Sequence, residues 1–157
     1  GGSLATYDHE TRDAIDVLKD KIDTQTATAL WEEALATTWT NPPVWVHGDI
    51  SPGNLLIRNG KLSAVIDFGQ LTVGDPACDL AITWTFFKDK SRDTFKAMLP
   101  LDANTWVRAR AWTLWKAFIT AANFTNPNNT EAKNCWQIID DVLTEHQKES
   151  IGKNYEP

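Results

Sequence analysis

The sequence has few of the features that mark membrane, secreted or metal-binding proteins. No apolar run approaches the roughly 20 residues that a membrane-spanning helix needs, and no signal peptide is visible. Its two cysteines, Cys78 and Cys135, lie in helical contexts without the paired spacing of a metal site. We therefore expect reduced thiols in the core and a cytoplasmic protein.

The chain also lacks an excess of positive charge. It has 15 Lys and Arg against 21 Asp and Glu, for a net charge of −6. Nucleic acids and anionic membranes bind basic surfaces, so neither is expected as a partner, whereas a cationic small molecule is compatible with this charge. A hydrophobic content of 42% over 157 residues predicts one soluble domain, residues 1–157.

The residues that could carry out catalysis or bind a metal lie mostly in one stretch, residues 44–79. It contains His47-Gly48-Asp49, then Asn54, then Asp67-Phe68-Gly69, interleaved with the β-prone runs 44–46, 54–57 and 62–66. Asn59-Gly60 lies between the last two runs and is a strong hairpin signal, because both residues tolerate positive φ. Such a hairpin would bring Asn54 close to Asp67, with Asp49 in the loop just before it.

The three oxygen-bearing side chains suit phosphoryl transfer. Mg²⁺ prefers hard oxygen ligands and usually takes one or two protein carboxylates together with substrate phosphates, so we predict Asn54 and Asp67 as metal ligands. Asp49 remains as the base that orients an attacking hydroxyl. Each tripeptide alone is common and says little. The prediction rests on their order and spacing.

This pattern resembles a known family. His-x-Asp, four residues, Asn and then Asp-Phe-Gly is similar to the catalytic and metal-binding loops of protein-kinase-like folds. With Gly48 in place of the usual Arg, and with Gly74-Asp75-Pro76 and Asp79-Leu80-Ala81 downstream, it resembles the aminoglycoside phosphotransferase and choline kinase-like family.

The resemblance implies a role for each matching residue. Asp49 would be the catalytic Asp, and Asn54 and Asp67 the metal ligands. His47 would brace the loop, and Asp79 would be a structural residue that supports it. The family's cofactors are ATP and Mg²⁺, and its acceptors are small molecules that carry a hydroxyl group.

The flanking sequence is mostly helical. Apolar periodicity and capping residues predict helices at 7–22, 24–39, 76–87, 91 or 93 to 99, 102–124 and 130–146, a polar loop at 126–129 and a frayed tail at 152–157. The expected fold class is mainly α with a small β hairpin (α+β). This layout matches the C-terminal lobe of a protein-kinase-like fold.

A complete kinase-like enzyme also needs a glycine-rich flap and a lysine on an N-terminal strand. The sequence has no Gly-x-Gly-x-x-Gly, and the 46 residues before His47 are predicted to form two helices. We therefore expect the N-terminal nucleotide-binding lobe to be absent from this chain. Either the lobe is part of a longer enzyme and poorly active alone, or it is a non-catalytic binding or dimerisation module, with apolar surface that favours self-association.

Four acidic residues near the C-terminus, Asp140, Asp141, Glu145 and Glu149, are candidates for binding a cationic acceptor. The resemblance suggests this, because family substrate pockets lie between the catalytic loop and the later helices. A solvated acidic helix face is the favoured interpretation, and these residues are not assigned to the site.

Overall fold

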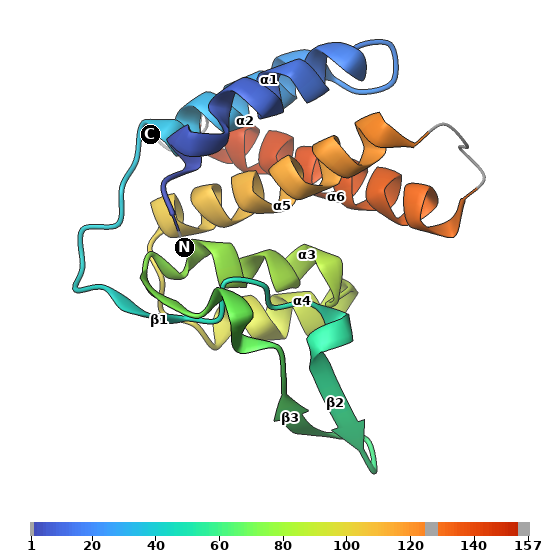
Figure 1. The fold of residues 1–157 in the computed structure, drawn as a ribbon. Helices are drawn as coiled ribbons and strands as arrows, with labels where there is room; N and C mark the ends of the chain where they lie inside the picture. Colours follow the sequence, from blue (N-terminus) through green and yellow to red (C-terminus); the bar gives the residue numbers. More distant parts are fainter. Residues whose placement is uncertain (1, 125–128, 154–157) are drawn as a thin grey trace.

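The protein, described by a computed structural model over residues 2–124 and 129–153, has a layer of long helices beside two small sheets (Figure 1). Its elements in chain order are η1 (Leu4–Tyr7), α1 (Asp8–Val17), α2 (Thr24–Leu35), β1 (Val44–Val46), η2 (Pro52–Asn54), β2 (Leu55–Arg58), β3 (Lys61–Val65), η3 (Phe68–Gln70), β4 (Thr72–Gly74), η4 (Pro76–Ala81), α3 (Ile82–Thr85), α4 (Asp89–Ala97), α5 (Ala103–Asn123) and α6 (Thr130–Lys153). The predicted α+β class is confirmed. Within the described residues, no helix combines the length and apolar character needed to cross a membrane.

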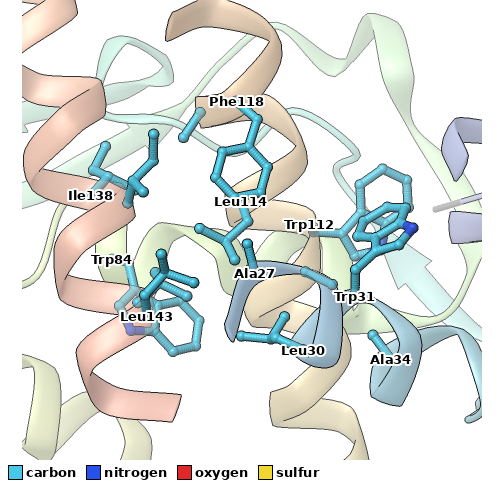
Figure 2. Packing of buried hydrophobic residues seen from close by; sticks show 14 of the residues in the cluster. Ala27, Leu30, Trp31, Ala34, Trp84, Trp112, Leu114, Phe118, Ile138 and Leu143 are labelled. Atoms are coloured by element: carbon cyan, nitrogen blue, oxygen red, sulfur yellow. The ribbon is translucent and has the colours of Figure 1, made fainter. Parts of the chain in front are cut away.

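The long helix α5 is the centre of the molecule. Every residue from 105 to 114 is buried, so the helix is covered on all sides over three turns. Its neighbours are α1, α2, α6 and η4. Leu114 and Phe118 of α5 pack with Trp31 of α2 and Ile138 of α6 in the core cluster (Figure 2). This helical layer is the frame on which the rest of the chain is built.

Three predicted helix starts are confirmed. The Asp23 carboxylate accepts a hydrogen bond from the Thr26 amide at 3.0 Å, and Asp102 accepts one from the Thr105 amide at 2.9 Å. Helix α6 begins at Thr130 as expected, with Asn129 accepting a hydrogen bond from the Glu131 amide, and it continues past residue 146 to residue 153. The expected loop residues 126–128 and the tail residues 154–157 lie outside the described residues.

The first two helices end earlier than the periodicity predicted. Helix α1 stops at Val17 instead of residue 22, because a turn closed by the Lys21 amide on the Leu18 carbonyl follows it. Helix α2 stops at Leu35 instead of residue 39. There the Thr37 hydroxyl donates to the Ala34 carbonyl and accepts a hydrogen bond from Arg108. These side-chain bonds compete with the backbone bonds that would extend the helix.

Two further helices differ from expectation. The segment predicted as one helix over residues 76–87 is the 3-10 helix η4 followed by the single-turn helix α3. Helix α4 begins at Asp89, before the expected Ser91 or Asp93. The Ser91 hydroxyl lies in its first turn, where it accepts a hydrogen bond from the Lys88 amide at 3.0 Å.

The predicted hairpin is confirmed, and it pairs β2 with β3 around Asn59 and Gly60, whose φ angles are +52° and +72°. Two positive φ values are the conformation of a type I′ turn. The sequence analysis missed strand β4. It pairs antiparallel with β1, Val44 opposite Gly74 and Val46 opposite Thr72, and so fixes the end of β1 where the candidate loop begins.

The acidic face of α6 forms ion pairs across the helical layer. Asp141 pairs with Arg92 at 2.8 Å, Glu145 with Lys96 at 2.5 Å, and Glu149 with Arg110 at 2.8 Å. The predicted solvated face is therefore wrong for Asp141 and Glu145, which are partly buried against basic side chains, whereas Glu149 is ion-paired but exposed. Asp140 is exposed.

Glu145 is the central acceptor in this cluster. Its carboxylate also accepts a hydrogen bond from the Trp84 indole at 2.9 Å and lies 3.5 Å from Arg110, whose side chain is 1% exposed. Burial alone raises the pKa of Glu145, but hydrogen bonds from Lys96 and Trp84 and the charges of Lys96 and Arg110 outweigh it. The net pKa is below its usual value of 4.5.

We predict that Glu145→Gln lowers the free energy of unfolding by about 3 kcal/mol at about pH 6, since it leaves buried cations with too little negative charge. Because the folded pKa is depressed, this stabilisation is complete above the usual pKa and is lost as the pH falls through the folded value. Urea unfolding at about pH 6 and about pH 3 should show the difference shrinking in acid.

The matched control is Asp140→Asn, on the same helix with an exposed side chain, which should change stability by less than about 0.5 kcal/mol. A Glu145→Gln effect as small as that of the control would contradict the prediction.

Candidate functional site

The candidate loop begins at the end of β1 and is held by one carboxylate. Asp79, in η4, accepts hydrogen bonds from the backbone amides of His47 at 2.6 Å and Gly48 at 2.8 Å, one on each oxygen. Bonds from amides to a charged acceptor are among the stronger hydrogen bonds in proteins. Asp79 therefore fixes the backbone that leads directly into Asp49, which agrees with the supporting position that the resemblance implies.

Gly48 is required by the backbone at this point. Its φ is +84°, and a Cβ built on it would lie 2.4 Å from the carbonyl oxygen of Gln70. Any larger residue would both strain the backbone and collide with the neighbouring chain. The sequence analysis noted glycine at this position but had no signal for the contact with Gln70.

His47 connects the loop to the strand end before Asp67. Its ring is 8% exposed and packs against Phe68 with ring centroids 4.8 Å apart. The Asp49 amide donates to Nδ1 at 3.3 Å, so Nδ1 is unprotonated, and Nε2–H donates to the Ile66 carbonyl at 2.9 Å. The histidine side chain therefore bridges the loop and the strand end.

Asn54 joins the same hydrogen-bond network. Its carbonyl accepts from the Ile66 amide at 3.0 Å, at the open end of the hairpin where Leu55 pairs with Val65. Its side-chain Nδ2 donates to the Asp49 carbonyl at 2.8 Å. The hairpin thus brings the backbone of Asn54 to Ile66, the residue before Asp67, while the Asn54 side chain contacts the backbone of Asp49.

Asp67 follows Ile66 with φ 64° and ψ 62°, in the left-handed region. This conformation costs a non-glycine residue about 1 kcal/mol or more, and such strained residues cluster at active sites and ligand clamps. Both the Asp49 and Asp67 side chains are exposed, which leaves them accessible to a ligand.

The donor set suits Mg²⁺ bound together with a phosphate. Because Asn54 uses its amide nitrogen on the Asp49 carbonyl, its amide oxygen is the atom that can ligate a cation. In the described part of the chain, no group of three or more His, Cys, Asp or Glu could hold a metal ion by itself. One carboxylate and one amide, completed by phosphate oxygens and water, is a coordination that Mg²⁺ accepts.

A second anchor holds η4 in place. Arg108 of α5 is 3% exposed and its Nε donates to the Asp75 carboxylate at 2.6 Å, while Asp75 also accepts from the Ala77 amide at 3.0 Å. Since Asp79 lies in the same short helix, the buried arginine ties the loop support to the central helix. The sequence analysis missed this pair, whose members are separated by 33 positions.

A cavity of about 640 Å³ opens beside Asp49. Its walls are the loop at 48–52, the η4–α3 segment, the second half of α5 and the first turns of α6, together with Gly2, Tyr7 and Gln70. Both cysteines line it, and burial raises the pKa of each thiol, as do the nearby charges of Asp79 for Cys78 and Glu131 for Cys135. Both are free thiols, as expected.

Sequence comparisons agree with this geometry. The chain is 38% identical over 65 residues to the aminoglycoside 3'-phosphotransferase of Escherichia coli, and 30% identical over 86 residues to the uncharacterized protein YcbJ of Bacillus subtilis (strain 168). These matches cover 41% and 51% of this chain. They span only 24% and 28% of the lengths of the two relatives.

A solved structure is also similar, that of a thermostable mutant of aminoglycoside phosphotransferase APH(4)-Ia in its apo form. The TM-score is 0.47 at 22% sequence identity, over 81% of this chain and 47% of that one. The family model described as "phosphotransferase enzyme family" matches residues 3–112, which include the whole hydrogen-bonded loop and its supports. This chain belongs to the phosphotransferase enzyme family.

Proposed function

We propose that this chain carries the catalytic loop of an ATP- and Mg²⁺-dependent phosphotransferase that acts on a hydroxyl group of a small molecule. The observation that carries the proposal is the hydrogen-bond network that joins Asn54 to the backbone of Asp49 and to the strand end before Asp67. Membership of the phosphotransferase family supports it.

Each residue then has a defined task. Asp49, exposed at the cavity, accepts the proton of the acceptor hydroxyl and orients its oxygen. Asn54 and Asp67 hold Mg²⁺, which when bound neutralises the negative charge of the phosphates. His47 and Asp79 keep the loop in position and touch neither substrate. The cavity beside Asp49 is the place for the acceptor, because it is the concave space that this carboxylate faces.

The two small sheets and the segments beside them carry exposed apolar side chains near this loop, which together we call the strand surface. Its members are large hydrophobic side chains between 40% and 74% exposed: Val44, Trp45, Leu56, Ile57, Leu62, Ile66, Phe68, Leu71 and Val73. Exposed apolar area of this kind marks an interaction site. The relatives are several times longer than the segments matched here, and this supports a nucleotide-binding lobe of the same protein as its partner.

In this proposal the chain alone turns over poorly. The phosphate-clamping lysine and the glycine-rich flap belong to the partner lobe, and the loss of one such charge-stabilising donor costs roughly 3–4 kcal/mol of transition-state stabilisation. Binding of the nucleotide is therefore a sharper test of this chain than turnover.

We predict that the chain binds ATP in a Mg²⁺-dependent manner, and that Asp67→Ala weakens this binding at least about tenfold, or ~1.4 kcal/mol, by removing a metal ligand. Isothermal titration calorimetry with and without Mg²⁺ measures the ATP affinity of each variant. Asp93→Ala, an exposed carboxylate on α4, is the control and should leave the affinity unchanged.

Equal affinities for the Asp67→Ala variant and the control would contradict the assignment of Asp67. A complete lack of Mg²⁺-dependent binding in the wild-type chain would favour the alternative function, a non-catalytic binding or dimerisation module, for which the strand surface is the supporting observation.

We also predict that the isolated chain self-associates through the strand surface when its partner lobe is missing. In sedimentation equilibrium, the wild-type chain should associate with rising concentration, whereas Trp45→Lys combined with Leu62→Lys should remain monomeric. Met98→Lys, which alters an apolar residue that is 76% exposed at the C-terminal cap of α4, should behave like the wild type. A wild-type chain that stays monomeric would count against an unpartnered interface here.

A further inference from the structure

The cavity beside Asp49 carries little charge. Among its described lining residues, Asp49, Lys116 and Glu131 are the charged ones. Lys116 and Glu131 have opposite signs, so apart from Asp49 this lining is neutral in sum. Asp49 has to receive the hydroxyl proton, so a cationic group of the acceptor would find little negative charge elsewhere in these walls.

The acidic residues that could have bound a polycation form ion pairs outside the described cavity lining. Asp141, Glu145 and Glu149 pair with Arg92, Lys96 and Arg110. None of the three lines the cavity. Apart from Asp49, Glu131 is the one carboxylate among the described lining residues, so several ammonium groups would lose hydration that these walls do not replace. An acceptor with several amino groups therefore matches these walls poorly.

The walls offer apolar contact instead. Tyr7, Trp112 and Trp115 all line the cavity and contact one another, with ring centroids between 4.3 and 5.4 Å apart. Ala117 and Ile138 extend this wall along α5 and α6. Rings of this type favour the flat apolar face of another ring system.

The aromatic wall is a poor cage for a compact cation. Lys116 Nζ already lies 5.9 Å from the centre of the Trp115 ring, and Trp112 is only 8% exposed. The volume of about 640 Å³ is in the range of drug-sized ligands and far exceeds a small quaternary ammonium compound.

Taking the phosphotransferase function proposed above as given, we propose that the acceptor is an uncharged hydroxyl compound with a flat apolar ring system. It would place a hydroxyl at Asp49 and its ring face against Tyr7, which is only partly buried. A sugar that carries several amino groups is then not the preferred ligand of this chain.

Calorimetric titration with three probes tests the proposal. 4-Methylumbelliferyl β-cellobioside is uncharged and has hydroxyl groups and a flat fused ring, kanamycin is a polycationic sugar of similar size, and choline is a compact cation. We expect the glycoside to bind at least about tenfold more tightly than either of the others, or ~1.4 kcal/mol. Equal or tighter binding of kanamycin or choline, or no binding of the glycoside, would overturn the proposal.

Added negative charge in the cavity gives an independent readout. Thr120 and Asn134 line the cavity and neither is fully buried. Thr120→Glu combined with Asn134→Glu adds two negative charges to the walls and should raise kanamycin affinity at least about tenfold. Lys133→Glu changes the net charge equally, on an exposed residue of α6 outside the lining, and should have a much smaller effect.

A double variant that folds but binds kanamycin no better than Lys133→Glu would overturn the proposal. If circular dichroism shows that the double variant is unfolded, Thr120→Phe replaces it, because the larger side chain occupies cavity space. It should weaken glycoside binding at least about tenfold, and unchanged affinity would overturn the proposal.

Asp49→Asn separates this inference from the proposed function. The variant should keep detectable glycoside binding, because the apolar wall is unchanged and an asparagine can still accept a hydrogen bond from the hydroxyl, while phosphoryl transfer by the protein that includes the nucleotide-binding lobe should be lost. Intact glycoside binding with no transfer by the unsubstituted protein would count against the phosphotransferase function alone. A preference for kanamycin or choline would count against the acceptor class alone.

Discussion

The candidate site depends on a carboxylate that binds two consecutive backbone amides. Asp79 holds the backbone amides of His47 and Gly48, and so fixes the position of the backbone just before Asp49, which lines the cavity. The His47 ring donates a hydrogen bond to the Ile66 carbonyl, and the Ile66 amide donates one to the Asn54 carbonyl. The Asn54 side chain in turn donates to the Asp49 carbonyl. The chain of contacts closes on itself, so no member can move without breaking at least one bond.

This arrangement requires a rigid support, and the central helix provides it. Arg108 is buried in α5 and holds Asp75 at the start of η4, the short helix that carries Asp79. Helix α5 also forms one wall of the cavity beside Asp49. Helix α5 thus both supports the loop and shapes the cavity. The ion pairs of α6 with α4 and α5 use the acidic residues that would otherwise have been available to a cationic ligand.

Local signals made much of this structure predictable. The Asn59-Gly60 turn and the Asp102 cap are each encoded within a few residues, and the motif spacing located the loop. Contacts between distant segments could not be predicted in this way. The three-residue strand β4 is too short for a periodic pattern, and the approach of Gln70 to Gly48 leaves no trace in composition. The cavity has walls from several segments, so only the folded chain shows which charged residues are among its described lining.

The most direct test of this account is amide hydrogen exchange at His47, Gly48 and Asp49 in the wild-type chain and in Asp79→Asn. An asparagine offers one acceptor oxygen in place of two, so these amides should exchange at least about tenfold faster, while amides in the middle of α5 should change only as much as global stability does. Unchanged protection at all three positions would show that Asp79 does not hold the loop.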